Sequence, residues 1–180
     1  MATRTITAGR MKIIVTAKVV NTMEDGTVSS NVQGVTLDSG EIVDGTDAYE
    51  ADRAWSYVVD VADGVTQQID VYDFASLDIG GGAGNDSLGQ SLVLAEIVGI
   101  TIHNRGPGWL EIDDSITGGF SQFGQLTGAK AIKQGGWRAM FDPQDPAIDV
   151  TDSSDHLIDL TARSGYGNLT CEVHLLGRSA

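Results

Sequence analysis

The sequence predicts an all-β fold, a jelly-roll-like antiparallel β-sandwich with an N-terminal β-hairpin or extended arm. Three observations lead to this prediction. Apolar residues recur with a period of two, glycine-bearing turns separate the apolar runs, and no segment has a capped helical period longer than about two turns. The 180 residues are 41% hydrophobic and contain 23 glycines but 3 prolines, which is typical of a globular, turn-rich chain.

The clearest strand lies near the C-terminus. Leu169, Cys171, Val173 and Leu175 alternate with polar residues, so the strand has one apolar and one polar face and places His174 outward. The same alternation predicts strands at 158–162 and 55–61. The turn signal at 62–65 predicts that the strand 55–61 and the one containing Ile69 form a hairpin of antiparallel neighbours.

A second hairpin is predicted near the N-terminus, from Met11–Val20 and Thr27–Leu37 joined by a turn around Glu24-Asp25-Gly26. Its second strand has a weak apolar face, so this hairpin needs a partner to be stable. The β-branched run within Leu92–Ile102 predicts a central strand. The segment Asp47–Trp55 is the best candidate for a short helical turn.

The length predicts one main domain at 46–180, preceded by a basic arm and hairpin at 1–45. The formal net charge of −14 argues against direct binding to nucleic acid, because such binding needs clustered cations. Residues 1–23 carry four cations and no acid, whereas residues 24–86 hold fourteen acids and only Arg53. This asymmetry favours head-to-tail contact between copies, with these candidate contact residues in the arm: Arg4, Arg10, Lys12 and Lys18.

Cys171 is the only cysteine, so no disulfide can form within the chain. No apolar run approaches the roughly 20 residues that cross a bilayer, and no membrane association is expected. The stretch Met11–Lys18 resembles a signal peptide but is interrupted by Lys18 and lacks a cleavage site, which favours a strand.

Metal binding has only weak support. The segment Gly81–Leu88 matches one copy of a calcium-binding nonapeptide, which makes Asp86 a weak calcium candidate, but stacked copies are needed to complete such sites. Acidic groups at 44–52 and 149–155 lack EF-hand spacing. The three histidines are too far apart in sequence for a zinc motif. We therefore expect no cofactor.

No enzymatic motif stands out. A Gly-x-Ser-x-Gly elbow and a Walker loop are both missing, which favours a protein that is not an enzyme. A carboxylate pair for glycoside hydrolysis stays open, because such a pair need not be close in sequence. Trp55, Trp109 and Trp137 are expected to anchor the core or a self-interface rather than a sugar platform.

From about residue 45 to 177 the chain resembles small virion proteins of tailed bacteriophages, of the head decoration or cement type. Residues at both ends of this range carry the resemblance, together with the predicted central strand: Ala51-Asp52-Arg53-Ala54-Trp55, Glu96-Ile97-Val98-Gly99-Ile100, Ile132-Lys133-Gln134-Gly135-Gly136-Trp137, Phe141-Asp142-Pro143 and Asp155-His156-Leu157-Ile158. These motifs describe the order of strands and turns and name no active site.

The resemblance implies a structural protein of the capsid exterior, assembled in the host cytoplasm, that associates as a trimer or dimer and bridges copies of the major capsid protein. Trp109 joins the arm cations as a candidate contact. The main alternative is a receptor- or glycan-binding module of a head fibre or tail, and a third is a depolymerase.

Overall fold

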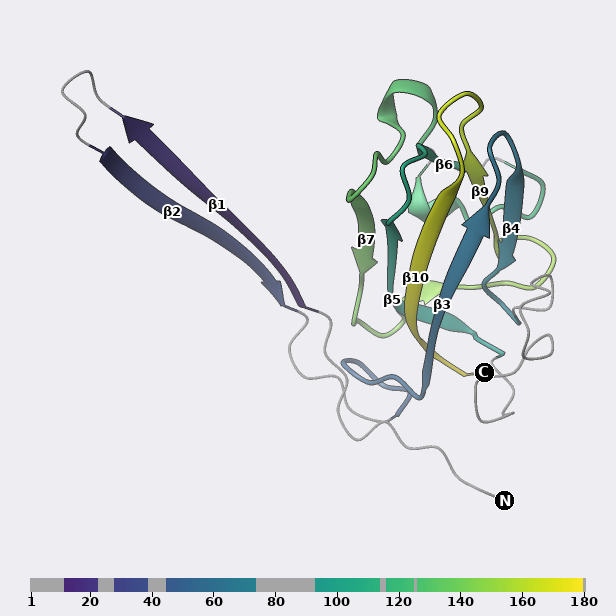
Figure 1. Ribbon diagram of the computed structural model, residues 1–180. Helices are drawn as coiled ribbons and strands as arrows, with labels where there is room; N and C mark the ends of the chain where they lie inside the picture. The colour runs from purple at the N-terminus through teal and green to yellow at the C-terminus, as the bar shows by residue number, and fades with distance from the viewer. Residues whose placement is uncertain are drawn as a thin grey trace.

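The computed structural model describes residues 12–22, 28–38, 45–73, 93–113, 116–124 and 126–179. Within them the chain forms an antiparallel β-sandwich and, as a sheet of its own, an N-terminal hairpin (Figure 1). This confirms the predicted all-β class. The only helices among the described residues are two short 3₁₀ turns, at Ser121–Phe123 and Gly128–Lys130.

The larger sheet of the sandwich has the order β3-β10-β5-β7, with β8 also paired to β5, and the smaller has the order β4-β9-β6. In chain order, the bounds are β3 Arg53–Val61, β4 Thr66–Asp70, β5 Glu96–Asn104, β6 Leu110–Asp113, β7 Trp137–Phe141, β8 Ile148–Asp149, β9 Leu157–Ala162 and β10 Leu169–Arg178. The predicted strands at 55–61, 158–162 and 169–175 are therefore confirmed. The predicted central strand corresponds to β5, which lies between β10 and β7.

Strands that follow one another mostly alternate between the two sheets, from β3 in the larger sheet to β4 in the smaller and then back to β5. The predicted hairpin across 62–65 is therefore wrong in its pairing. β3 pairs with β10 and β4 pairs with β9, so the turn carries the chain from one sheet to the other. A turn signal shows where the chain reverses, but the apolar pattern cannot tell whether the next strand pairs with the last or packs across from it.

The two sheets bury their apolar faces against each other. Each apolar period contributes alternate residues: β10 buries Leu169, Cys171, Val173 and Leu175, and β9 buries Ile158, Leu160 and Ala162. Phe120, fully buried, joins this core from the segment between β6 and β7. Inward-facing alternate residues from two sheets are what stabilises a sandwich.

A register shift on β5 changes which face its residues occupy. Gly177 of β10 pairs with Ile97 and Leu176 with Gly99, so Val98 has no direct partner on β10. Val98 instead packs with Ala51, and this small second core is separate from the main one. The segment before β3 is thereby held against the sandwich. The short helical turn predicted within 47–55 is wrong. The N–H of Glu50 donates to the Asp47 carbonyl oxygen in a single turn, but Tyr49 in that turn has a positive φ, and β3 begins at Arg53.

The N-terminal hairpin consists of β1 Lys12–Thr22 and β2 Val28–Asp38, close to the predicted bounds. The two strands pair antiparallel along their whole length, from Lys12 opposite Asp38 to Thr22 opposite Val28. Among the described strands, β1 and β2 pair only with each other. The turn predicted at 24–26 lies outside the described residues.

Candidate interaction surfaces

The end of the sandwich where the chain enters after the hairpin is strongly acidic. We call it the arm end, and it comprises 45–52, 71–73, 142–147 and 150–156, which precede or follow strands on that side. These loops contain no lysine or arginine, and they carry eight acidic residues: Asp47, Glu50, Asp52, Asp73, Asp142, Asp145, Asp152 and Asp155.

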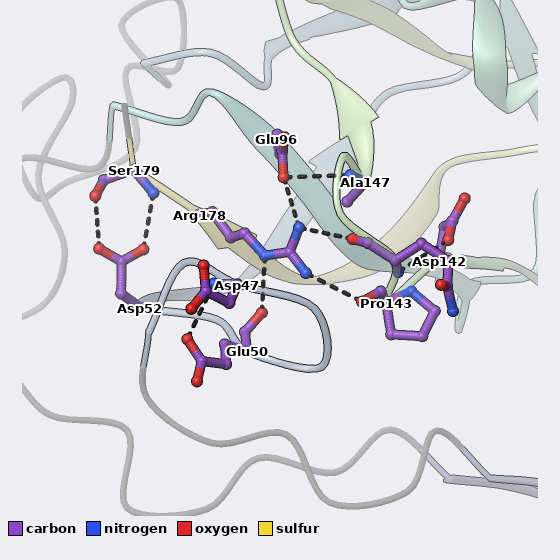
Figure 2. Close-up of polar contacts among 10 residues, drawn as sticks. Asp47, Glu50, Asp52, Glu96, Asp142, Pro143, Ala147, Arg178 and Ser179 are labelled. Atoms are coloured by element: carbon purple, nitrogen blue, oxygen red, sulfur yellow. Dashed lines mark hydrogen bonds and ion pairs between the residues drawn. The ribbon is translucent and has the colours of Figure 1, made fainter.

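A buried arginine organises the arm end. Arg178 ends β10, and its side chain is 2% exposed. Its Nη1 donates to Glu96 Oε2 at 2.6 Å and to the Gln144 carbonyl oxygen at 2.8 Å. Nε donates to the Glu50 carbonyl oxygen at 3.0 Å, and Nη2 donates to that of Pro143 at 3.1 Å (Figure 2). One side chain thus joins β5, β10 and two loops, and its buried charge is paired as such charges must be.

The contacts around Arg178 also fix the neighbouring carboxylates. Asp52 accepts hydrogen bonds from the backbone N–H and the hydroxyl of Ser179, at 2.7 and 2.6 Å, and from Arg53 at 2.7 Å. Glu96 accepts a further hydrogen bond from the Ala147 N–H. Figure 2 shows Asp52 beside Ser179, and Glu96 between Arg178 and Ala147, so groups from distant parts of the sequence meet here. Several acids here are therefore structural rather than free ligands.

The same network presents an exposed aromatic side chain. Tyr49 has a positive φ of 63° and is 49% exposed. Its N–H donates to the Pro143 carbonyl oxygen at 2.7 Å, and its hydroxyl accepts from the Gln144 side chain at 3.3 Å. Because Arg178 binds the carbonyl oxygens of the same two residues, the loop that carries Tyr49 is held in place.

The opposite end of the sandwich has the reverse charge. This far end comprises 62–65, 105–109, 127–136 and 163–168. Asp63 is the only acid in these loops, against four cations: Arg105, Lys130, Lys133 and Arg163. Exposed apolar side chains lie in or next to the same loops, namely Val65 at 50%, Trp137 at 44% and Tyr166 at 42%.

Trp109 lies at the centre of the far end, surrounded by other side chains. Its ring stacks on Tyr166, with centroids 4.3 Å apart. Lys133 Nζ lies 4.6 Å from the Trp109 centroid, and Arg163 Cζ lies 5.4 Å from it. Cations held over aromatic rings are a stabilising arrangement. Trp109 therefore orders the loops, while Tyr166 and Trp137 offer the exposed aromatic surface.

Asp63 fixes the loop that carries Tyr166. Its carboxylate accepts the N–H groups of Gly165, Tyr166 and Gly167 at 3.1, 3.2 and 3.0 Å. These hydrogen bonds hold the pKa of the Asp63 carboxyl below its usual range, and the bond from Gly165 contributes most. Desolvation acts in the opposite direction, and the bonds from Gly167 and Tyr166 lower the pKa further. The far-end acid is thus used to order a loop. Arg105 lies 3.5 Å from a carboxylate oxygen of Glu172, and Arg163 lies 3.7 Å from one of Glu111, so Lys130 and Lys133 supply most of the uncompensated positive charge of these loops.

The outer face of the larger sheet carries two histidines and a glutamate. His103 Nδ1 and His174 Nε2 each lie 3.6 Å from a different oxygen of Glu172. Cys171 faces the core, as predicted, and burial raises its thiol pKa to about 12. No cluster of histidine, cysteine and carboxylate side chains within the described part of the chain is arranged to hold a metal ion.

The predicted contact residues lie in different parts of the chain, and the structure describes some of them. Trp109 belongs to the far-end cluster. Lys12 and Lys18 lie on β1, opposite Asp38 and Val32. Arg4, Arg10 and the calcium candidate Asp86 lie outside the described residues.

Sequence reasoning missed Arg178, Tyr49 and Tyr166. Arg178 ends an apolar strand next to the terminus, and nothing in its local sequence distinguishes it from a solvated residue. The gathering of Lys133, Arg163 and Arg105 could not be found either, because they come from separate loops.

None of the helices in the described ranges is long and apolar enough to cross a membrane. Comparisons with protein-family models, with curated proteins and with solved structures gave no match for this chain.

Proposed function

We propose that the chain is a structural protein of a tailed-bacteriophage virion, which decorates the capsid exterior and bridges neighbouring subunits of the major capsid protein. The proposal combines the resemblance over residues 45–177 with the division of the chain into a hairpin and a sandwich. The alternation of strands between sheets supports the jelly-roll assignment, because jelly rolls pass repeatedly from one sheet to the other.

The observation that carries the proposal is the pairing of the hairpin. β1 and β2 pair with each other over eleven residue pairs, so each strand has one edge paired in the hairpin. No other described strand pairs with the remaining edge of either. An isolated two-stranded hairpin is marginally stable in water, and its open edges are templates for an added strand. Contact with a neighbouring protein would stabilise it, as in other cases of strand addition.

The arm end explains how such an arm would transmit force. The chain passes from the hairpin to Gly45 and then into the loop fixed by Arg178 and by the Ala51–Val98 contact. Load applied to the arm therefore reaches a loop that is hydrogen-bonded to β10 and packed on β5. Many such modest contacts on one particle would sum by multivalency.

The experiment compares particles assembled with the full-length protein, with a chain lacking residues 1–23, and with a full-length Arg4→Gln/Arg10→Gln/Lys12→Gln/Lys18→Gln variant. We expect electron cryo-microscopy to show added density on the capsid exterior with the full-length protein. Both altered chains should lose occupancy while circular dichroism shows a folded sandwich. Undiminished occupancy of the chain lacking residues 1–23 would show that the arm is not needed for attachment. Undiminished occupancy of the glutamine variant alone would show that the arm binds without its cations. Absence of the wild-type protein from the capsid exterior would refute the proposal as a whole.

One observation favours the alternative of a glycan-binding module. Trp137 and Tyr166 expose aromatic surface at the far end, where sugar rings could stack. Trp109 is less suitable, because Tyr166 and two cations surround its ring. Binding on a glycan array that is lost in Trp137→Ala, but retained in Val58→Ala at an equally exposed apolar site of the same sheet, would support this alternative.

A further inference from the structure

The two ends of the sandwich carry opposite charge, and both expose aromatic side chains. The arm end has eight acids and no cation in its loops, and the far end has four cations and one acid. Each also exposes aromatic surface, Tyr49 at the arm end and Trp137 and Tyr166 at the far end. Aromatic and arginine side chains are enriched at the centres of protein interfaces.

We propose that the far end of one copy docks on the arm end of a second copy. The contact would place Lys130, Lys133 and Arg105 against the acidic loops at 142–156. It uses two different patches, so it is heterologous and can continue from copy to copy, unlike the contact of a twofold dimer. This inference adds a contact between copies to the proposed function, but its physical basis is independent of a capsid.

The loops at both ends are ordered before any contact forms. Asp63 and Trp109 fix the loop of Tyr166 at the far end, and Arg178 fixes the loop of Tyr49 at the arm end. Ordered loops lose little conformational entropy on binding, which favours association through modest surfaces. Contact between two arm ends is excluded by like charge, so charge also selects the orientation.

The first test is the salt dependence of self-association. The net charge of −14 makes copies repel one another at long range, whereas the proposed contact pairs opposite charges at short range. At about 0.1 M salt the Debye length is about 10 Å, which screens repulsion between molecular centres but preserves pairs in contact. At about 1 M it is about 3 Å, and contact pairs weaken too. We expect analytical ultracentrifugation to show concentration-dependent association of the wild-type chain at the lower salt that is lost at the higher salt.

A charge swap provides the decisive test. The Lys130→Glu/Lys133→Glu variant makes the far end acidic. The Asp145→Lys/Asp149→Lys/Asp152→Lys variant leaves the segment 142–156, which includes β8, with three lysines against Asp142 and Asp155; all five changed positions are exposed. Each variant alone should be monomeric where the wild-type chain associates. An equimolar mixture should associate again, because the acidic far end of one variant meets the basic segment 142–156 of the other. Misfolding cannot produce this rescue.

Two full-length controls separate this contact from other possibilities. Val58→Glu changes an exposed residue in the middle of β3, away from both ends, and should associate like the wild-type chain. The variant with glutamine at the four arm cations should also associate, because the contact lies between sandwich ends. Loss of association in that variant would assign the contact to the arm and overturn the docking proposal while leaving the proposed capsid role intact.

The remaining outcomes count against the proposal. It is overturned by a wild-type chain that stays monomeric at every concentration, by reversal variants that associate normally, or by a mixture that gives no rescue. Heparin serves as a probe for another occupant of the far end, an anionic polysaccharide in place of a second copy. Heparin binding that needs Lys130 and Lys133, in a chain that does not self-associate, would likewise overturn it.

Discussion

The two ends of the sandwich use charged side chains in opposite ways. At the arm end, Arg178 is buried and bonded to a carboxylate and three carbonyl oxygens, whereas at the far end Lys133 and Arg163 lie over partly exposed aromatic rings. A buried, fully bonded cation contributes to the folded structure, because removing it leaves a carboxylate unpaired. A cation at the surface contributes less to stability, because solvent screens its contacts, and its charge lies where a partner can reach it.

The largest expected effect comes from Arg178→Met. It leaves Glu96, whose side chain is 17% exposed, without its cation, and should lower the free energy of unfolding by about 3–5 kcal/mol. Urea denaturation followed by circular dichroism measures this. Arg178→Met combined with Glu96→Met should recover part of the loss, because no unpaired charge remains. An equal or larger loss in the double variant would show that the carbonyl contacts, not the ion pair, dominate.

A smaller effect is expected at the far end from Gly108→Ala. A Cβ at Gly108 would collide with the carbonyl oxygen of Gly167, and neither backbone segment can move freely because Gly108 N–H donates to the Asn168 carbonyl oxygen. We expect a loss of about 1–3 kcal/mol in urea denaturation, as in other overpacked sites. Gly135→Asn is the matched control: no atom lies within 4 Å of its Cβ, and asparagine tolerates the positive φ. A cost equal to that of Gly108→Ala would argue against the collision.

The smallest effects concern one carboxylate near each end, whose contributions to the pH dependence of stability have opposite signs. Burial raises the pKa of Asp70 at the end of β4, against hydrogen bonds from Tyr72 and Asp73 and the nearby His156, whereas the pKa of Asp63 is lowered. Asp63 therefore adds stability above its ordinary pKa of 3.8, and that stability is lost as pH falls through its lower folded value. Asp70 has the reverse effect: the folded state gains stability as pH falls through its raised folded pKa.

Melting temperatures measured across acid pH test this pair. Asp63→Asn should melt below the wild-type chain at neutral pH, and the difference should shrink below about pH 4. Asp70→Asn should melt at or above the wild-type temperature at neutral pH, because an amide is cheaper to bury than a carboxylate, and its advantage should shrink in acid. The same sign of change in both variants would contradict the assigned environments.

Much of the sandwich could be predicted from local pattern. The alternation in β3, β9 and β10 reflects a physical requirement that one face of each strand meets the core, so it is visible in the sequence. Glycine-bearing turns likewise mark where strands end. The prediction of a helical turn at 47–55 was wrong because the conformation of this segment depends on contacts with Val98 and Arg178, which lie far away in sequence.

Local pattern was enough to predict the strands with clear apolar alternation, the uneven charge along the chain and the pairing of the N-terminal hairpin, but not β6, β7 and β8. The strand order of the sandwich, the burial of Arg178 and the collection of acids and cations at opposite ends became visible in the folded chain alone. The physical reason is that period and turn chemistry act between neighbouring residues. Sheet order and charge placement depend on how distant segments close around one core, and loops from four parts of the chain then share one end.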